Sequence, residues 1–267
     1  MSQRRTITGF SNPTVKFLRS LREKKHRKAS GKFLAEGLRL LTDARTSGHV
    51  PEVLVMATGR EPHPLLDALE ADVLAADGEV LEMSPDLLTK VTGKDNPQAV
   101  AGVFAEFDTS LAALDRSGAK IWLVAQALRD PGNLGTMLRT GDAVGAGGLI
   151  LIDDCADPFS VEAVRASMGA VFTQRIALAK WEEFLPWLRG GPGQLVAASL
   201  RDAVGYRAAP YAAPCFVMVG NESRGLPEDY EAVCDLRVTM PMKGRADSLN
   251  AAVAAAVLAY EALAALD

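Results

Sequence analysis

The second half of the chain alternates short apolar segments with helical ones, and this alternation most constrains the fold. Strands are predicted at Ile121–Ala125, Leu149–Ile152, Leu195–Ser199, Cys215–Gly220 and Leu236–Met240. Helices are predicted at Leu134–Val144, Val161–Met168, Glu182–Leu188 and Ser248–Leu266. Apolar strands that alternate with helices form a parallel sheet covered on both faces. We therefore predict an α/β domain over residues 119–267, with ligands bound at the loops that leave the carboxyl ends of its strands.

Residues 1–108 predict a smaller α/β domain. Its expected helices are Pro13–Lys28, Glu36–Ser47, His63–Ala71 and Pro85–Val91. Its expected strands are Glu52–Met56, Glu79–Met83 and Ala99–Phe107. Residues 109–118 contain Arg116-Ser117-Gly118, and we interpret this polar segment as the linker between the two domains.

The charge of the chain is distributed unevenly. Between Arg4 and Arg39 there are eleven Lys or Arg and two Asp or Glu, whereas the whole chain carries a net charge of −4. A basic segment on an acidic body is expected of a protein that binds phosphate at one end. The predicted helix Pro13–Lys28 presents most of these cations, and a solvated helix face without a partner is the alternative. The residues predicted to bind RNA backbone are Lys16, Arg19, Arg22, Lys24, Lys25, Arg27, Lys28 and Lys32.

The composition excludes several classes of protein. Three dispersed cysteines, Cys155, Cys215 and Cys234, predict neither a disulfide framework nor a metal site. No apolar stretch is long enough to span a membrane, and the polar, basic N-terminus does not resemble a secretory signal. We expect a reduced, cytoplasmic protein that holds no metal.

The first of three informative loops follows the strand that ends at Ala125. Asn133 is placed to cap the next helix, and Arg139 on that helix offers fixed donors suited to phosphate. The alternatives are that Asn133 acts only as a cap and that Arg139 pairs with Asp142 on the surface.

The other two loops follow the last two predicted strands. Gly220-Asn221-Glu222-Ser223-Arg224 stands at the end of one strand, where glycine lets a ligand approach the backbone. The loop after Met240 leads into the last helix, which Asp247 or Ser248 is expected to cap. The alternatives are an ordinary turn and a well-packed helix made of small residues.

Taken in order, the three loops resemble the motifs of the SpoU (TrmH-type) family of SPOUT-class RNA 2′-O-ribose methyltransferases. The motifs are Asn-x-Gly-x-x-x-Arg-Thr from Asn133, Gly-Asn-Glu-x-x-Gly-Leu from Gly220, and Pro-Met-x-Gly followed by Ser-Leu-Asn at 248–250. The resemblance covers about residues 119–267. The N-terminal part is similar in layout to the family's substrate-binding domain, which has a ribosomal-protein fold of the L30e type.

The resemblance implies a parallel sheet with a trefoil knot, S-adenosyl-L-methionine as cofactor, and a homodimer whose active sites are completed by the partner. The cofactor contacts carry over to Gly220, Met240 and Leu249, with Leu200 as a further candidate. The catalytic set carries over to Asn133, Arg139, Glu222, Ser248 and Asn250.

The family's proposed role for Arg139 is base toward the 2′-hydroxyl. An arginine side chain loses its proton only above about pH 12, so a neutral guanidinium is costly. We favour phosphate binding and stabilisation of the forming alkoxide.

Three other functions are weighed against ribose methylation of ribosomal RNA. The scaffold could bind RNA without catalysis, or methylate tRNA in place of ribosomal RNA. A nicotinamide-dependent dehydrogenase is disfavoured, because Gly-x-Gly-x-x-Gly is missing from the first strand-to-helix turn.

Overall fold

The computed structural model describes residues 3–93 and 99–267, and the chain divides into two compact units. Unit 1 comprises Met1–Phe107 together with Phe159–Thr173. Unit 2 comprises Asp108–Pro158 and Gln174–Asp267. Residues 159–173, which were predicted to belong to the second domain, pack with the first.

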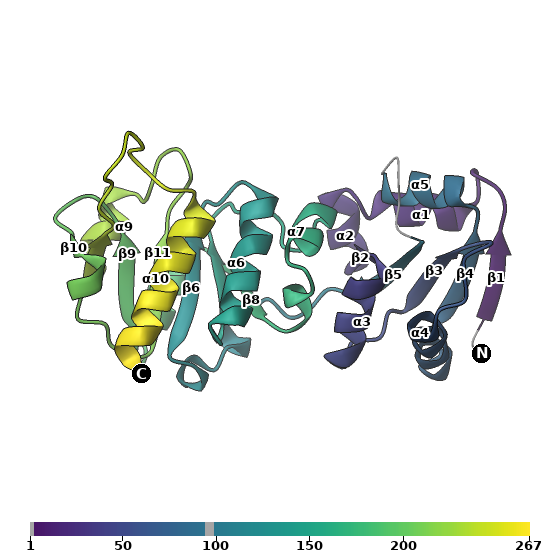
Figure 1. Ribbon diagram of the computed structural model, residues 1–267, viewed down its shortest axis with the longest axis horizontal. Coiled ribbons are helices and arrows are strands. Elements are labelled where there is room, and N and C mark those ends of the chain that lie inside the picture. The colour runs from purple at the N-terminus through teal and green to yellow at the C-terminus, as the bar shows by residue number, and fades with distance from the viewer. Residues whose placement is uncertain (1–2, 94–98) are drawn as a thin grey trace. The chain divides into compact units, whose positions relative to one another are not determined.

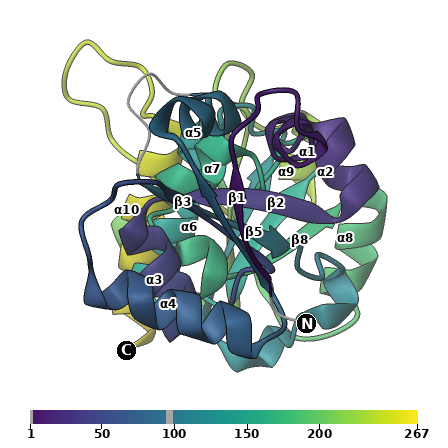
Figure 2. The ribbon, with the colours of Figure 1, turned by 90° about the vertical axis from the view of Figure 1, so that its right-hand side faces the viewer.

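Unit 1 is a five-stranded sheet between two layers of helices. The strands lie in the order β1-β4-β3-β5-β2, in which β1, β4 and β3 are parallel and β5 is antiparallel to both β3 and β2. Figure 2 shows α1, α2 and α5 on one side of this sheet and α3 and α4 on the other. The elements are β1 (Gln3–Ile7), α1 (Pro13–Ser20), α2 (Lys24–Ser30), β2 (Lys32–Glu36), α3 (Leu38–Thr46), β3 (Val53–Ala57), α4 (Pro64–Ala75), β4 (Glu79–Met83), α5 (Pro85–Thr92) and β5 (Val100–Ala105), with α7 (Val161–Ala166) and a 3-10 turn (Ala170–Phe172) from the returning segment.

The returning segment is held in unit 1 by aromatic rings. The ring centroid of Phe33 lies 5.0 Å from that of Phe159 and 6.0 Å from that of Phe172. Phe172 also contacts Phe104, at 4.8 Å between centroids. Such ring pairs stabilise beyond their buried area. The segment is therefore part of the core of unit 1.

The predicted helix Pro13–Lys28 is two helices, and this corrects one predicted RNA contact. The helix is interrupted between α1 and α2. The carbonyl of Leu21 therefore has no intrahelical donor. Arg27 is only 2% exposed and donates from Nη1 to that carbonyl at 2.8 Å. Arg27 thus stabilises the break and is not available to RNA. Lys32 lies on the strand β2, half-buried, and pairs with Glu52.

Unit 2 is a seven-stranded sheet in the order β10-β12-β9-β11-β6-β7-β8, and every pair of neighbours is parallel, as predicted. The helices α6 and α10 cover one face (Figure 1). The elements are β6 (Ile121–Gln126), α6 (Pro131–Ala143), β7 (Gly148–Ile152), β8 (Arg175–Ala179), α8 (Trp181–Arg189), β9 (Gln194–Ala198), β10 (Val204–Gly205), β11 (Cys215–Val219), α9 (Glu228–Ala232), β12 (Leu236–Thr239) and α10 (Ala251–Leu266), with short 3-10 turns at Leu111–Ala113, Arg116–Gly118 and Tyr206–Ala208.

The opposite face of this sheet carries an aromatic core. Trp122 on β6 stacks on Phe216 on β11, with 5.7 Å between ring centroids, and α8 adds Phe184 and Leu188. Alternate residues of β6, β7 and β11 face this core or the helices α6 and α10 on the other side. Among the described residues, we find no helix with the length and apolar character needed to cross a membrane.

Candidate cofactor and catalytic site

The carboxyl ends of β9, β11 and β12 open into one cavity of about 430 Å³. Parallel neighbours end at the same edge of a sheet, so the loops that follow them meet there. In Figure 1 the loops after β11 and β12 rise together at the upper end of unit 2. All four residues predicted to contact the cofactor line this cavity, namely Leu200, Gly220, Met240 and Leu249.

Gly220 is required by close packing of the loop that follows it. A β-carbon added to Gly220 would lie 2.3 Å from the carbonyl carbon of Gly225 and 2.4 Å from the amide nitrogen of Leu226. The loop folds back because Gly225 donates its amide to Asn221 O at 2.9 Å, with Gly225 at a φ of +68°. Any larger residue at position 220 would displace this wall of the cavity.

The helix α6 begins earlier than predicted, and its cap is a different residue. Asp130 is the N-cap, accepting from the amide of Asn133 at 2.7 Å, and Pro131 occupies the first helical turn. The prediction that Asn133 caps this helix is therefore wrong. An aspartate before proline is a strong start signal, and it leaves the Asn133 side chain free for other partners.

The side chain of Asn133 joins all three motif loops. Asn133 Nδ2 donates to Glu222 Oε1 at 3.1 Å, and Asn250 Nδ2 donates to Asn133 Oδ1 at 2.8 Å. Asn250 Oδ1 accepts from the amides of Ala252 and Val253 and so caps α10. Because Glu222 can only accept and the cap of α10 needs an oxygen, the orientation of each amide in this chain is fixed.

Glu222 holds the loop after β11 to the start of α6. Its carboxylate accepts from the amides of Arg129 and Asp130 at 3.4 and 3.3 Å. Burial acts to raise the pKa of Glu222, but the hydrogen bonds from its own amide, Asn133, Arg129 and Asp130 together outweigh burial and lower that pKa. Glu222 is therefore an ionised anchor and is unsuited to donate a proton.

The cap of α10 corrects a second prediction. Neither Asp247 nor Ser248 caps the helix, because the helix starts at Ala251 and Asn250 is its cap. Ser248 Oγ donates to Asp247 Oδ1 at 2.9 Å, and both residues line the cavity. Ser248 is thus placed to contact a ligand.

Arg139 lies on α6 between one and two turns beyond Asn133 and is exposed. Among residues 3–93 and 99–267, no hydrogen bond or ion pair to the Arg139 guanidinium is found. Arg139 does not line the cavity of its own chain. Its guanidinium can bind an anion that arrives from outside the chain.

Two groups near the carboxyl edge were missed by sequence reasoning. Asp153, after β7, accepts from Gln126 Nε2 and Tyr230 Oη at 3.0 and 3.1 Å and from the amide of Trp181. Glu231 and Arg201 line the cavity as an ion pair. A lone Asp after an apolar strand and a Glu in a five-residue helix give no sequence signal that separates them from surface residues.

In unit 1, three of the predicted RNA contacts lie together. Lys16, Arg19 and Arg22 line a hollow of about 550 Å³ together with Ser20, Glu23 and Glu162. Lys24, Lys25 and Lys28 are exposed on α2. Six of the eight predicted cations therefore remain accessible in this unit.

Both halves of the chain match known protein families. Residues 120–260 match the model of the SpoU rRNA methylase family, and residues 12–102 match the MRM3-like substrate-binding domain. Among curated proteins, a 23S rRNA (guanosine(2553)-2′-O)-methyltransferase of Bacillus subtilis is 32% identical, over 95% of this chain and 97% of the relative.

Two similar solved structures contain the cofactor. The AdoMet-bound rRNA methyltransferase of Sinorhizobium meliloti is 38% identical, with a TM-score of 0.92 and 99% of each chain covered. The SpoU methyltransferase AviRb of Streptomyces viridochromogenes, in complex with AdoMet, is 28% identical, with a TM-score of 0.86 over 95% of this chain and 97% of that one. Two of the motif loops line one cavity, the first is hydrogen-bonded to both through Asn133, and the matches run along nearly the whole length. The chain therefore belongs to the SpoU rRNA methylase family.

Proposed function

We propose that this protein transfers a methyl group from S-adenosylmethionine to a ribose 2′-hydroxyl of ribosomal RNA. The observation that carries the proposal is the convergence of three strand-end loops on one cavity, with the motif residues Asn133, Glu222 and Asn250 in one hydrogen-bonded chain. The Bacillus subtilis relative acts on 23S rRNA, and the amino-terminal match is to a substrate-binding domain.

The cavity suits the cofactor in size and lining. About 430 Å³ lies within the range of small-molecule sites, and Leu226, Val238, Met240 and Leu249 supply an apolar wall. Because Gly220 has no side chain, its main-chain groups can approach a ligand closely. In this proposal the backbone at Gly220, Met240 and Leu249 holds the adenosine, and Leu200 packs beside it. When bound, the cofactor supplies an electrophilic methyl group on a positively charged sulfur.

Arg139 acts in this proposal on the RNA. Its exposed guanidinium binds the phosphate next to the target ribose and stabilises the negative charge that develops on the 2′-oxygen. Asn133, Asn250 and Glu222 position the loops, and Ser248 contacts substrate or cofactor. Alignment of the 2′-oxygen with the methyl group accounts for much of the acceleration.

Substitution Arg139→Lys separates the two roles proposed for this residue. Lysine keeps the positive charge but cannot donate two parallel hydrogen bonds to a phosphate as arginine does. We therefore expect the rate of methylation to fall about 10- to 100-fold, with cofactor affinity unchanged. A near-normal rate would contradict bidentate positioning. A rate that rises with pH in Arg139→Lys but stays flat in the parent would favour the assignment of Arg139 as base.

The active form in this proposal is a homodimer that pairs through α10. Along the exposed face of this helix, Val253 and Tyr260 are 47% and 54% exposed, with Val257 between them and Leu249 just before the helix. An apolar stripe of this kind is typical of an interface. Arg139 lies outside the cavity of its own chain, which supports completion of each site by a second copy. Tyr260→Glu should yield a monomer in analytical ultracentrifugation.

The finer features of the fold are also proposals. The strand β12 pairs with β9, yet the chain that follows it returns to pack α10 on β11, β6 and α6, and this crossing supports a trefoil knot. The layered sheet of unit 1 supports the L30e-type assignment. We also propose a cytoplasmic location, which the similarity to a bacterial 23S rRNA enzyme supports.

Calorimetry combined with methyl transfer tests the function as a whole. We expect S-adenosylmethionine to bind, and 23S rRNA to accept the methyl group faster than tRNA. RNA binding without methylation would favour a non-catalytic scaffold, and faster transfer to tRNA would favour the tRNA alternative. Binding of a nicotinamide dinucleotide in place of S-adenosylmethionine would refute the proposal.

In this proposal the cations of unit 1 bind the RNA backbone. Charge reversal of Lys16, Arg19 and Lys28 together should weaken RNA binding and reduce its salt dependence, because fewer counterions are released. Unchanged affinity would contradict this role.

A further inference from the structure

The wall of the cofactor cavity contains a buried carboxylate that takes no part in the motif network. Glu231 on α9 is only 6% exposed, and it lines the cavity together with Arg201. Its Oε2 accepts from Arg201 Nη1 at 3.3 Å. Carboxylates are rarely buried this far unless they are paired, because the charge loses its hydration. The pair with Arg201 accounts for the burial of Glu231 but not for the position of both charged groups in the cavity wall.

The charges around Arg201 do not balance. Arg201 Nη2 also pairs with Glu228 Oε1 at 3.3 Å, so two carboxylates share one guanidinium and the three side chains carry a net charge of −1. The Glu228 side chain is 81% exposed and does not line the cavity. The excess negative charge thus lies outside the cavity, and the cavity wall itself holds one carboxylate and one guanidinium.

Both members of the cavity-lining pair keep bonding capacity for a ligand. Among the described residues, no donor other than Arg201 contacts the Glu231 carboxylate, so Oε1 remains available. Two of the five N–H donors of Arg201 contact Glu231 and Glu228, which leaves three. A carboxylate acceptor and guanidinium donors thus stand side by side in one wall.

We propose that Glu231 and Arg201 bind the α-amino-acid end of the cofactor, an inference that rests on the proposed function. Glu231 binds the ammonium group and Arg201 binds the carboxylate. The amino-acid end is the part of the cofactor that carries adjacent opposite charges, and it matches an adjacent carboxylate and guanidinium. The ribose is a weaker match, because neutral hydroxyls need no guanidinium beside the acceptor.

Calorimetry with two ligands isolates this contact. S-adenosylhomocysteine has the amino-acid end, whereas 5′-methylthioadenosine lacks it, and neither carries a charged sulfur. We expect Glu231→Gln to weaken S-adenosylhomocysteine about 10- to 100-fold, as the loss of a charge-assisted hydrogen bond implies. The affinity for 5′-methylthioadenosine should change by less than about 2-fold. Glu228→Gln is the matched control, because Glu228 pairs with the same arginine outside the cavity.

Three results would overturn the inference. Equal weakening of both ligands by Glu231→Gln would place the contact at the nucleoside or make it structural. Unchanged binding of both would mean that the pair only stabilises α9. If Glu231→Gln does not fold, Arg201→Met at the more exposed partner must weaken S-adenosylhomocysteine selectively, and failure to do so would refute the role of the pair. A parent protein that binds neither ligand would refute the proposed function itself.

Discussion

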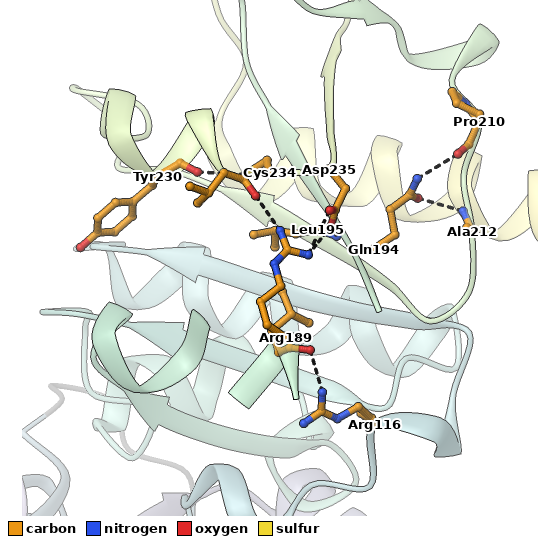
Figure 3. Close-up of polar contacts among 11 residues, drawn as sticks. Arg116, Arg189, Gln194, Leu195, Pro210, Ala212, Tyr230, Cys234 and Asp235 are labelled. Carbon is orange, nitrogen blue, oxygen red and sulfur yellow. Dashed lines mark hydrogen bonds and ion pairs between the residues drawn. The ribbon is translucent and has the colours of Figure 1, made fainter. Parts of the chain in front are cut away.

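The strands β9, β11 and β12 are built differently at their two ends. At the amino ends, Arg189 Nη1 pairs with both oxygens of Asp235 at 2.9 and 3.0 Å, and Asp235 Oδ2 accepts from the amide of Leu195 at 2.7 Å (Figure 3). Gln194 bonds to Pro210 and Ala212 at the same end (Figure 3). At the carboxyl ends the same strands open into the cavity.

This difference shows how a parallel sheet can leave one edge open for a ligand. Side chains at the amino ends bond to backbone groups of neighbouring segments, and none of these bonds involves the loops that line the cavity. The carboxyl-edge loops can then present main-chain groups to a ligand. The two ends are therefore expected to respond differently to substitution.

The largest effect is expected at the carboxyl end, for Gly220→Ala. The added methyl group meets the backbone at Gly225 and Leu226, so the loop must move away from the cavity. We expect S-adenosylhomocysteine to bind about 10- to 100-fold more weakly. Gly205→Ala is the control, because a β-carbon there meets nothing within 4 Å. If calorimetry gives Gly220→Ala and Gly205→Ala the same affinity for S-adenosylhomocysteine, the proposed difference between the two ends is wrong.

The next largest effect is expected at the amino end, for Asp235→Ala. This change leaves the amide of Leu195 and the guanidinium of Arg189 without their shared partner. We expect a loss of about 1–3 kcal/mol in the free energy of unfolding, measured by denaturant titration. Cofactor affinity of the folded variant should stay within about 2-fold, since less than 0.5 kcal/mol reaches the other edge. A large loss of affinity would show that the ends are coupled.

A smaller, pH-dependent effect is expected for Glu222→Gln. Hydrogen bonds lower the pKa of Glu222 in the folded protein, so its stabilising contribution is present above the unfolded pKa and is lost as pH falls through the folded pKa. The parent should therefore lose more stability than Glu222→Gln below about pH 4.5. Solvent screens this exposed charge, so we expect a difference below about 1 kcal/mol. Thermal melts across pH 3–7 test this, and parallel curves would contradict it.

The smallest effect is expected in the alkylation rates of the two thiols at the amino end, Cys215 and Cys234. Burial raises the pKa of Cys215 and of Cys234 to about 12, so both should resist alkylation in the folded protein. Cys234 donates to the carbonyl of Tyr230 beside Asp235 (Figure 3), so Asp235→Ala should make it react faster than Cys215. Mass spectrometry after brief iodoacetamide treatment measures this. Equal rates would show that the amino end opens as a whole.

Much of the fold was accessible from sequence because the strands of unit 2 are apolar and short. The strand β8, Arg175–Ala179, was missed because two of its five residues are alanine, which is depleted in strands. The strand β2 was missed because Lys32 was grouped with the basic run before it. Hydrophobic pattern alone cannot separate such edge strands from the elements beside them.

The site was predictable as a set of loops but not as a network. The motifs placed Gly220, Met240 and Leu249 together, whereas the caps were assigned to the wrong residues in both α6 and α10. Several capping residues stand in each loop, and backbone angles set by distant packing decide which one is used. The burial of Arg27 could not be predicted either, because it depends on an interruption between α1 and α2 that no residue type in the sequence indicates.

The return of residues 159–173 to unit 1 limits how relatives can be recombined. Phe159 and Phe172 complete the aromatic cluster of unit 1, and Arg165 pairs with the buried carboxylate of Glu36 at 3.5 Å. A chimera that grafts a foreign RNA-recognition module must therefore carry its own version of this insert, spliced into the transferase sequence at two further junctions. A chimera joined only near residue 108 would separate Phe159, Arg165 and Phe172 from their partners in unit 1.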